Sequence, residues 1–249
     1  MATLTRRVAA RPRDYVRVAG PDAADFLQRM LSNDIEQAPC RAMLLTPKAR
    51  LIATVLVVRR AADDFLLLTE PGLGEPVAST LVRARFAAKV EIEPEQHASV
   101  IALGEQGDIP NDELGEIGAE LIDSDLEPTL SEDDVERLRI EAARPAWGKE
   151  LDDSILPAEA GLDETHISFT KGCYPGQEPI ARLHHRGHAN RRLTVLDVEA
   201  ARPGDEIVHD GKAVGRVTSA VPGVALGYVR VEVPEGAEVR AGGAVARLR

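Results

Sequence analysis

Short runs of strand-forming residues with short connections between them restrict the fold more than any other feature of this sequence. Residues 15–18 alternate between apolar and polar side chains, residues 51–59 are mostly apolar, and residues 65–69 follow after an acidic turn. Residues 90–92 and 99–103 have strand character again. Connections of this length are typical of an antiparallel sheet. We therefore expect antiparallel β-structure in the first hundred or so residues.

Three helices are expected beside these strands. Pro21 suits the first position of one helix, and Pro76 begins a second. Ser131 is a good N-cap for a third, because its hydroxyl accepts from a free backbone amide and three carboxylates follow in the first turn. Apolar residues recur at helical spacing, at Phe26, Leu27, Met30 and Leu31, then Val77, Leu81, Val82 and Phe86, then Val135, Leu138 and Ala142. The pattern predicts an α+β fold with antiparallel sheets flanked by helices.

The C-terminal part of the chain changes character near residue 192. Short strand-like segments separated by glycine turns lie at residues 193–198, 206–209, 213–219, 225–231 and 244–248. This pattern is typical of a small β-barrel. We expect residues 1–190 to form two intertwined α+β subdomains and residues 191–249 to form the barrel.

Charge and cysteine content exclude several classes of protein. The 249 residues carry a formal net charge of −11, which argues against nucleic acid as a partner because phosphate binding needs a cationic surface. The longest apolar run, residues 51–58, is too short to cross a bilayer, so no membrane partner is expected. The two cysteines, Cys40 and Cys173, lie far apart and indicate a reduced intracellular protein rather than a disulfide framework. We expect a cytoplasmic location.

Residues 168–192 concentrate the chemically reactive side chains. They contain Cys173 and three of the six histidines. Gly172 and Gly176 bracket the cysteine, so the backbone there can adopt positive φ or approach a ligand closely. A cysteine on such a turn, next to Lys171, is placed for chemistry or for ligand contact. On composition alone, the alternative is a surface turn with a small apolar residue at its centre.

The residues Lys171-Gly172-Cys173-Tyr174-Pro175-Gly176-Gln177-Glu178, followed by Ala181-Arg182, resemble the K-G-C-Y-x-G-Q-E signature of the YgfZ family. These are folate-binding-fold proteins related to the glycine-cleavage T-protein and implicated in iron–sulfur cluster assembly or repair. The resemblance implies a T-protein-like fold, tetrahydrofolate or a derivative as ligand, and iron–sulfur proteins or assembly factors as partners. It extends over residues 138–162 and 211–229, and it is weaker in the N-terminal half.

The resemblance also implies roles for individual residues. Cys173 is expected to carry the chemistry, with Lys171 nearby favouring its thiolate. Glu141, in a stretch similar to a T-protein signature, matches the glutamate that recognises the pterin ring. A carboxylate can accept two parallel hydrogen bonds from such an edge. The alternative for Glu141 is a helix carboxylate that faces water or pairs with Arg144. The folate-binding residues implied are Glu141, Lys171, Tyr174, Gln177, Glu178 and Arg182.

The histidines of this stretch do not predict a metal site. Adjacent residues of a strand, such as His184 and His185, point to opposite faces, and no cysteine or carboxylate lies at a familiar metal-ligand spacing. A basic loop that contacts the anionic folate tail is the expected role, with Arg182, Arg186, Arg191 and Arg192 as candidates to hold carboxylates. A stable iron–sulfur cluster usually needs about four thiolates, so we expect folate or a partner to complete any cluster site.

One departure from the T-protein pattern affects the function. Residues 46–54 resemble the T-protein segment that ends in paired aspartates, one of which serves transfer of the aminomethyl group. Ala53 and Thr54 stand at these positions and offer no carboxylate. We therefore expect a folate-binding accessory protein for iron–sulfur enzymes. An aminomethyltransferase of glycine cleavage and a relative that only binds partners are the alternatives.

Overall fold

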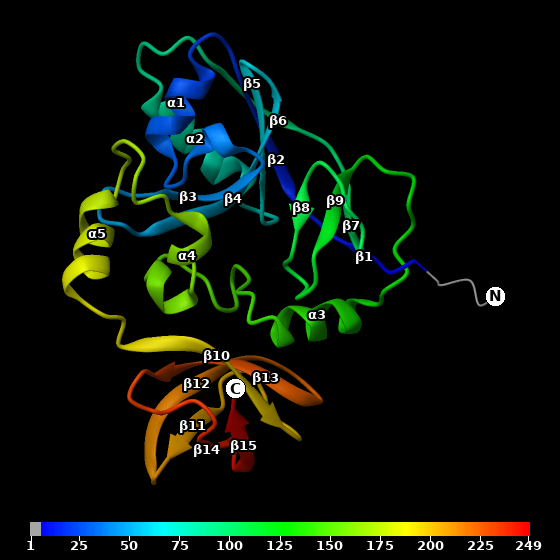
Figure 1. Cartoon of the computed structure of the whole chain (residues 1–249), viewed down its shortest axis with the longest axis vertical. Coiled ribbons are helices and arrows are strands. Elements are labelled where there is room, and N and C mark those ends of the chain that lie inside the picture. The colour runs from blue at the N-terminus through cyan, green and yellow to red at the C-terminus, as the bar shows by residue number, and fades with distance from the viewer. Residues whose placement is uncertain (1–5) are drawn as a thin grey trace.

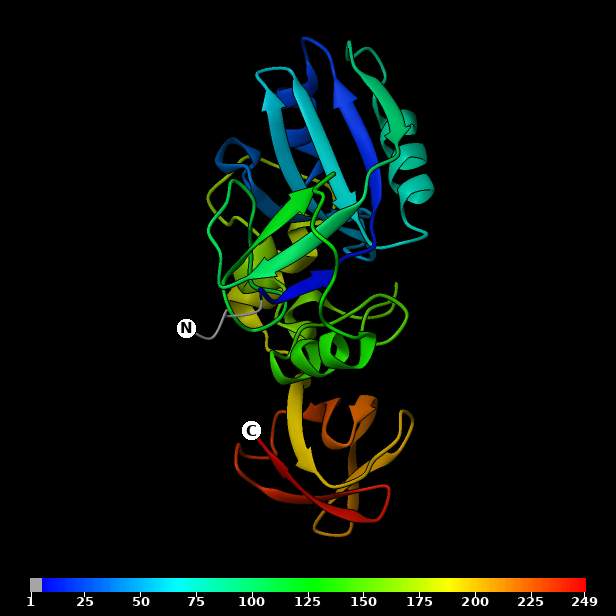
Figure 2. The same cartoon turned by 90° about the vertical axis from the view of Figure 1, so that its right-hand side faces the viewer.

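The computed structural model describes residues 6–249, without the side chain of Arg186. Figure 1 shows helices and sheets in the upper part of the molecule and a separate β-barrel below them, with helix α3 between the two. Figure 2 shows the same elongated arrangement from the side. The α+β fold with antiparallel sheets and a C-terminal barrel is confirmed.

The larger sheet has the strand order β3-β4-β5-β2-β6, and every neighbouring pair is antiparallel. Its strands are β2 (Asp14–Ala19), β3 (Cys40–Leu45), β4 (Leu51–Ala61), β5 (Asp64–Thr69) and β6 (Glu91–Glu95). Helices α1 (Ala23–Met30) and α2 (Gly74–Ala84) cover one face, together with the 3-10 turn η1 (Ile35–Gln37). Leu27, Phe65 and Leu81 are fully buried there, each contributing roughly 1.5–3 kcal/mol.

The smaller sheet has the order β1-β7-β9-β8. It consists of β1 (Val8–Ala10), β7 (Ser99–Leu103), β8 (Pro110–Asn111) and β9 (Gly118–Ile122). Ile109 and Ile122 pack against Tyr15 and Leu68 on the other face of the larger sheet. Helix α3 (Glu132–Glu141) follows. Ser131 is its N-cap as predicted, and it also forms a capping box with Asp134.

The segment after α3 returns to the larger sheet. It contains η2 (Pro157–Ala160), α4 (Asp163–His166) and α5 (Gln177–Arg186). Tyr174 and Ile180 pack with Met43 and Leu51 of the sheet in one apolar cluster, which also includes Tyr228 of the barrel. This segment therefore connects the two parts of the molecule by packing as well as by sequence.

The barrel closes through strands in the order β10-β13-β12-β11-β14-β15, because β10 pairs with both β13 and β15. The strands are β10 (Arg191–Val198), β11 (Glu206–His209), β12 (Lys212–Val221), β13 (Gly223–Arg230), β14 (Glu238–Ala241) and β15 (Ala244–Leu248). Strand β14 was absent from the sequence prediction. No helix in residues 6–249 is both long and apolar enough to span a bilayer.

Several local predictions are wrong. Helix α1 begins at Ala23 after Asp22, and α2 begins at Gly74, so neither proline opens its helix. Phe86 lies beyond the end of α2 and is 94 % exposed instead of lying on the apolar face. In α3, Ile140 is the fully buried residue, whereas Val135, Leu138 and Ala142 are half-buried.

Candidate functional site

A cavity of about 360 Å³ lies where the two sheets and the α3–α4 region meet. Its apolar lining includes Leu114, Val135, Leu151 and Leu162, and Thr54 of β4 lines it as well. Its charged and imidazole side chains come from distant parts of the chain, namely Arg11, Arg41, Glu70, Glu113, Arg139, Arg144 and His166. A mostly preformed cavity with an apolar lining and a few convergent polar groups is the usual form of a small-molecule site. We refer to it as the charged cavity.

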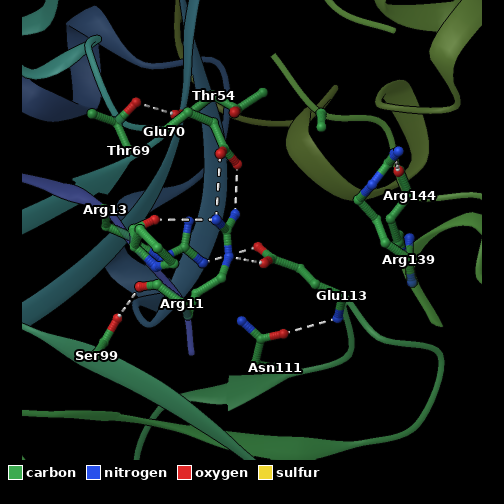
Figure 3. A network of polar contacts seen from close by, with 12 residues as sticks. Arg11, Arg13, Thr54, Thr69, Glu70, Ser99, Asn111, Glu113, Arg139 and Arg144 are labelled. Carbon is green, nitrogen blue, oxygen red and sulfur yellow. Dashed lines mark hydrogen bonds and ion pairs between the residues drawn. The ribbon is translucent and has the colours of Figure 1, made fainter. Parts of the chain in front are cut away.

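Arg11 links two carboxylates on one wall of the charged cavity (Figure 3). Its guanidinium donates to Glu70 at 2.5 Å and to Glu113 at 2.7 Å. Arg13, behind it, donates to Glu113 at 3.0 Å and forks onto buried Glu120 at 2.6 and 2.8 Å. Although burial opposes ionisation, Arg11 and Arg13 hold the pKa of Glu113 well below its usual range. This wall is therefore a fixed array of charges.

A second group of charges lies near the α3–α4 wall. Asp112 sits between two guanidinium groups, with Arg41 Nη2 and Arg144 Nη2 each 2.6 Å from one of its oxygens. Arg144 Nε is buried and has no hydrogen-bond partner among the described residues, and Arg41 and Arg144 both line the cavity. Burial lowers the pKa of His166 to about 3, and Arg41 acts in the same direction, so the imidazole is neutral at pH 7.

Arg139 connects the charged cavity to the barrel. It donates to Glu150 at 2.8 Å and to Ser219 of β12 at 2.8 Å, and the Ser219 hydroxyl donates to the other oxygen of Glu150 at 2.6 Å. The hydroxyl of Tyr228 donates to the Glu150 carbonyl at 2.9 Å. Every group in this junction has a partner, so it fixes the barrel against α3.

Thr54 reaches the charged cavity, whereas Ala53 is fully buried in the core of the larger sheet. The two residues alternate on β4, so only one of them faces the cavity. The position thus presents a hydroxyl where the T-protein resemblance implies a carboxylate.

Lys171 has a structural position in the loop before α5. Its ammonium donates to the carbonyl groups of Gln28, of Leu31 at 2.6 Å and of Asn33 at 2.9 Å. These carbonyls lie at the C-terminal end of α1, where free acceptors and the helix dipole favour a cation. Burial lowers the pKa of Lys171 to about 8. Because three carbonyls take its donors, the ammonium points at α1.

The rest of the loop combines a buried anchor with an exposed thiol. Tyr174 is buried in the apolar cluster, and burial raises its pKa to about 12. Gly176 has φ of 84°, and a Cβ there would lie 2.7 Å from the Thr46 carbonyl oxygen. Gln177 then begins α5 and is half-buried. Cys173, in contrast, is exposed.

The remaining predicted residues lie outside the charged cavity. Glu178 and Arg182 form an exposed ion pair of 3.1 Å on α5. Glu141, at the end of α3, is 39 % exposed and lies 3.6 Å from Arg137. The structure therefore does not bring Glu141 together with the Cys173 loop, and neither of them lines the cavity.

His184 and His185 lie on helix α5, so the prediction of a strand for them is wrong. The ring of His184 stacks on Phe169 with the ring centres 4.0 Å apart. The positive φ of Gly176 turns the chain directly into the helix, a change of direction that the sequence alone does not show. Among the described side chains, no three His, Cys, Asp or Glu residues lie close enough to hold a metal ion.

The charged residues of the cavity are not predicted by any motif in the sequence. Arg11 and Glu113 are 102 residues apart, and Arg11 and Glu70 are 59 apart. No local spacing marks such a group. The one sequence signal for this site was the resemblance of residues 46–54 to a T-protein segment, and Thr54 at its end does line the cavity.

Comparisons with known proteins agree with this architecture. Residues 190–249 match the family model described as "CAF17, C-terminal beta-barrel domain". The mouse "Iron-sulfur cluster assembly factor IBA57, mitochondrial" is 26% identical over 276 residues, which cover 90% of this chain and 77% of that protein. The barrel match and relatives of this kind fit the YgfZ/CAF17/IBA57 group of folate-binding-fold proteins. These matches agree with the resemblance read from the residues around Cys173.

Two further matches concern one part of the chain and its fold. A putative chloroplastic transferase of Arabidopsis thaliana is 43% identical over 102 residues, 38% of this chain but only 23% of that protein. The crystal structure of glycine cleavage system aminomethyltransferase T from Bartonella henselae superposes with a TM-score of 0.78 at 19% identity, covering 97% of this chain and 84% of that one. The T-protein-like fold is thus confirmed.

Proposed function

We propose that the protein binds a reduced folate in the charged cavity and supports the assembly or repair of iron–sulfur clusters, with Cys173 as its reactive thiol. The observation that carries the folate part is the charged cavity itself, which lies at the junction of the sheets and the α3–α4 region. Relatives named as iron–sulfur cluster assembly factors support the second part.

The chemistry of the cavity suits the parts of a folate. The amidine edge of a pterin needs a carboxylate acceptor. Among the residues that the structure describes, the Glu70 carboxylate accepts only from Arg11, so it keeps lone pairs for a ligand. The apolar lining suits the benzoyl ring. The anionic tail needs guanidinium donors, and Arg41 and Arg144 both line the cavity. A bound reduced folate would supply a carrier for one-carbon units, while these side chains would orient it.

The aminomethyltransferase alternative lacks the carboxylate that the T-protein resemblance implies at the position of Thr54. Thr54 offers a hydroxyl, and Glu113 has a strongly lowered pKa next to Arg11 and Arg13, so it is a poor proton acceptor near neutral pH. Aminomethyl transfer by the purified protein at the rate of a T-protein would contradict our proposal.

Cys173 is exposed and outside the cavity. An exposed thiol can be reached by a partner protein while folate occupies the cavity. With two cysteines in the chain, the other ligands of any cluster would come from that partner, since such clusters usually take about four thiolates. We propose a transient role for the thiol on this basis.

A pair of variants tests the assignment of the folate site. Glu70→Gln removes an ionised acceptor inside the cavity, and Glu141→Gln makes the same change on the exposed end of α3. A hydrogen bond to a charged partner contributes roughly 1.5–3 kcal/mol, about a ten- to hundredfold change in affinity. We expect that loss of tetrahydrofolate affinity for Glu70→Gln and an unchanged affinity for Glu141→Gln, measured by isothermal titration with melting temperatures as a folding control. The reverse result would support the sequence-based role of Glu141 and contradict the cavity.

A further inference from the structure

Residues 31–33, directly after helix α1, hold segments that lie far away in sequence. Ser32 is fully buried. Its hydroxyl donates to the carbonyl of His166 at 2.6 Å and accepts from the amide of Met43 at 2.8 Å. Its own carbonyl accepts from the amide of Ser168 at 3.1 Å. We refer to residues 31–33 as the connecting turn.

One set of contacts attaches the connecting turn to a wall of the charged cavity. Thr165 and His166, at the end of α4, line the cavity. The Asn33 side chain donates to the carbonyl of Thr165 at 3.4 Å and to that of Arg41, another lining residue, at 2.7 Å. Helix α4 has only four residues, too few for a helix that is stable alone. The position of this wall therefore depends on the connecting turn.

A second set of contacts attaches the connecting turn to the loop that carries Cys173. Lys171 donates to three carbonyls, and two of them belong to the connecting turn. Ser168 is bonded to the same turn through its amide, and its hydroxyl accepts from the Lys171 amide at 3.2 Å. Residues 167–176 belong to no helix or strand, and such segments open at low free energy unless tertiary contacts restrain them. The order of the Cys173 loop therefore also depends on the connecting turn.

We propose that the connecting turn couples the charged cavity to the Cys173 loop, so that a ligand in the cavity orders the loop. A ligand that contacts the α4 wall restricts its motion, and the hydrogen bonds of the turn extend this restriction to Ser168 and Lys171. The identity of the ligand, a reduced folate, rests on the proposed function. Coupling between two sites is reciprocal. A partner protein that holds the Cys173 loop should therefore raise the affinity for folate by the same factor.

The chain itself also joins the cavity wall to the loop, because Ile167 is the only residue between His166 and Ser168. Ile167 is buried in an apolar cluster, which restrains its side chain. The carbonyl before it and the amide after it both bond to Ser32 instead. Removal of the Ser32 hydroxyl therefore tests the hydrogen-bonded connection apart from the connection through the chain.

Hydrogen–deuterium exchange of the backbone amides, followed by mass spectrometry of the full chain, tests this proposal. Saturating tetrahydrofolate should slow exchange in residues 167–173 by at least about fivefold, the lower end of typical coupling between sites. Without ligand, Ser32→Ala should speed exchange in residues 162–166 and 167–173 by roughly five- to tenfold, because both segments lose one hydrogen-bonded support. In this variant tetrahydrofolate should still slow exchange in residues 162–166 but no longer in residues 167–173.

Thr194→Val is the matched control. Thr194 is a buried barrel residue whose hydroxyl also donates to a carbonyl, that of Arg249 at 3.2 Å. Its loss should leave exchange in both segments as in the wild type. Lys171→Met perturbs the connecting turn from the side of the loop, and it should speed exchange in residues 162–166 without any ligand.

Variants whose exchange changes only in the segment next to the substitution would overturn the coupling, whether or not tetrahydrofolate binds. Tetrahydrofolate that binds but leaves exchange in residues 167–173 unchanged would also overturn it, while the folate site would stand. If tetrahydrofolate does not bind, the folate site is contradicted. Faster exchange in both segments of both Ser32→Ala and Lys171→Met would then still support the connection through the turn.

Discussion

Replacement of Lys171 by methionine distinguishes a structural from a ligand-binding role for this residue. The substitution keeps an apolar stem but removes the ammonium that donates to three carbonyls at the end of α1. A hydrogen bond to a charged group contributes about 1.5–3 kcal/mol. Water can reach part of this half-buried site, so we count one to two such bonds and expect a loss of roughly 3 kcal/mol in the free energy of unfolding.

For a chain of this size, 1 kcal/mol shifts the melting temperature by about 2–4 °C, so Lys171→Met should melt roughly 6–12 °C lower. The assay is thermal unfolding followed by circular dichroism, with tetrahydrofolate titrated below the melting temperature of the variant. Lys48→Met is the control, because Lys48 is exposed and surface changes usually stay within about 0.5 kcal/mol. A Lys171→Met protein with the wild-type melting temperature but without folate affinity would refute the structural role.

Three further predictions concern the Cys173 loop and the contact between the sheets. Cys173→Ala should leave the melting temperature unchanged, because the thiol is exposed, and should lower the activity of iron–sulfur enzymes in cells. Cys40→Ala should lower stability instead, since Cys40 packs against the apolar core. Equal loss of protein in both variants would contradict this prediction. Gly176→Ala should cost about 1–3 kcal/mol of stability, because Gly176 has a positive φ and its added Cβ would clash with the backbone at Thr46. Gly172→Ala should cost little, since there is open space around Gly172. Equal effects of the two variants in unfolding titrations would be inconsistent with the loop geometry. His97 lies between two carboxylates, and its pKa is raised chiefly through its hydrogen bond to Glu95. The stability that it contributes is therefore complete below about pH 6.5 and is lost as pH rises through the folded-state pKa. The difference in melting temperature between wild type and His97→Gln should shrink from pH 5.5 to pH 8.5, and a growing difference would contradict this direction.

Much of the fold follows from local sequence patterns. The strands at residues 99–103, 206–209 and 244–248 match the prediction at both ends, because short runs that contain apolar residues lie close to glycines there. Ser131 was recognised as an N-cap because its hydroxyl and the carboxylate three residues later are a local signal. These features depend on residues close together in sequence.

The failures involve contacts between distant segments. Helix α5 follows from the left-handed conformation of Gly176, which is fixed by close packing against the turn at Thr46. The charged wall of the cavity brings Arg11 to Glu113 across 102 residues. Lys171 contacts carbonyl groups that lie 138–143 residues away in sequence, at the end of α1. Its closeness to Cys173 in sequence suggested instead that its ammonium lies beside the thiol. No spacing rule within one segment reports such contacts.

Calorimetric titration of the wild-type protein with tetrahydrofolate, alongside a tetrahydropterin that lacks the benzoylglutamate tail, tests the central claim most directly. We predict one binding site per chain for tetrahydrofolate, and weaker binding of the tailless pterin because it cannot use Arg41 and Arg144. Arg144→Ala should then lower the affinity for tetrahydrofolate and leave the affinity for the tailless pterin unchanged. The absence of any binding by the wild-type protein, or an affinity for tetrahydrofolate that Arg144→Ala and Glu70→Gln both leave unchanged, would contradict the assignment of the charged cavity as a folate site.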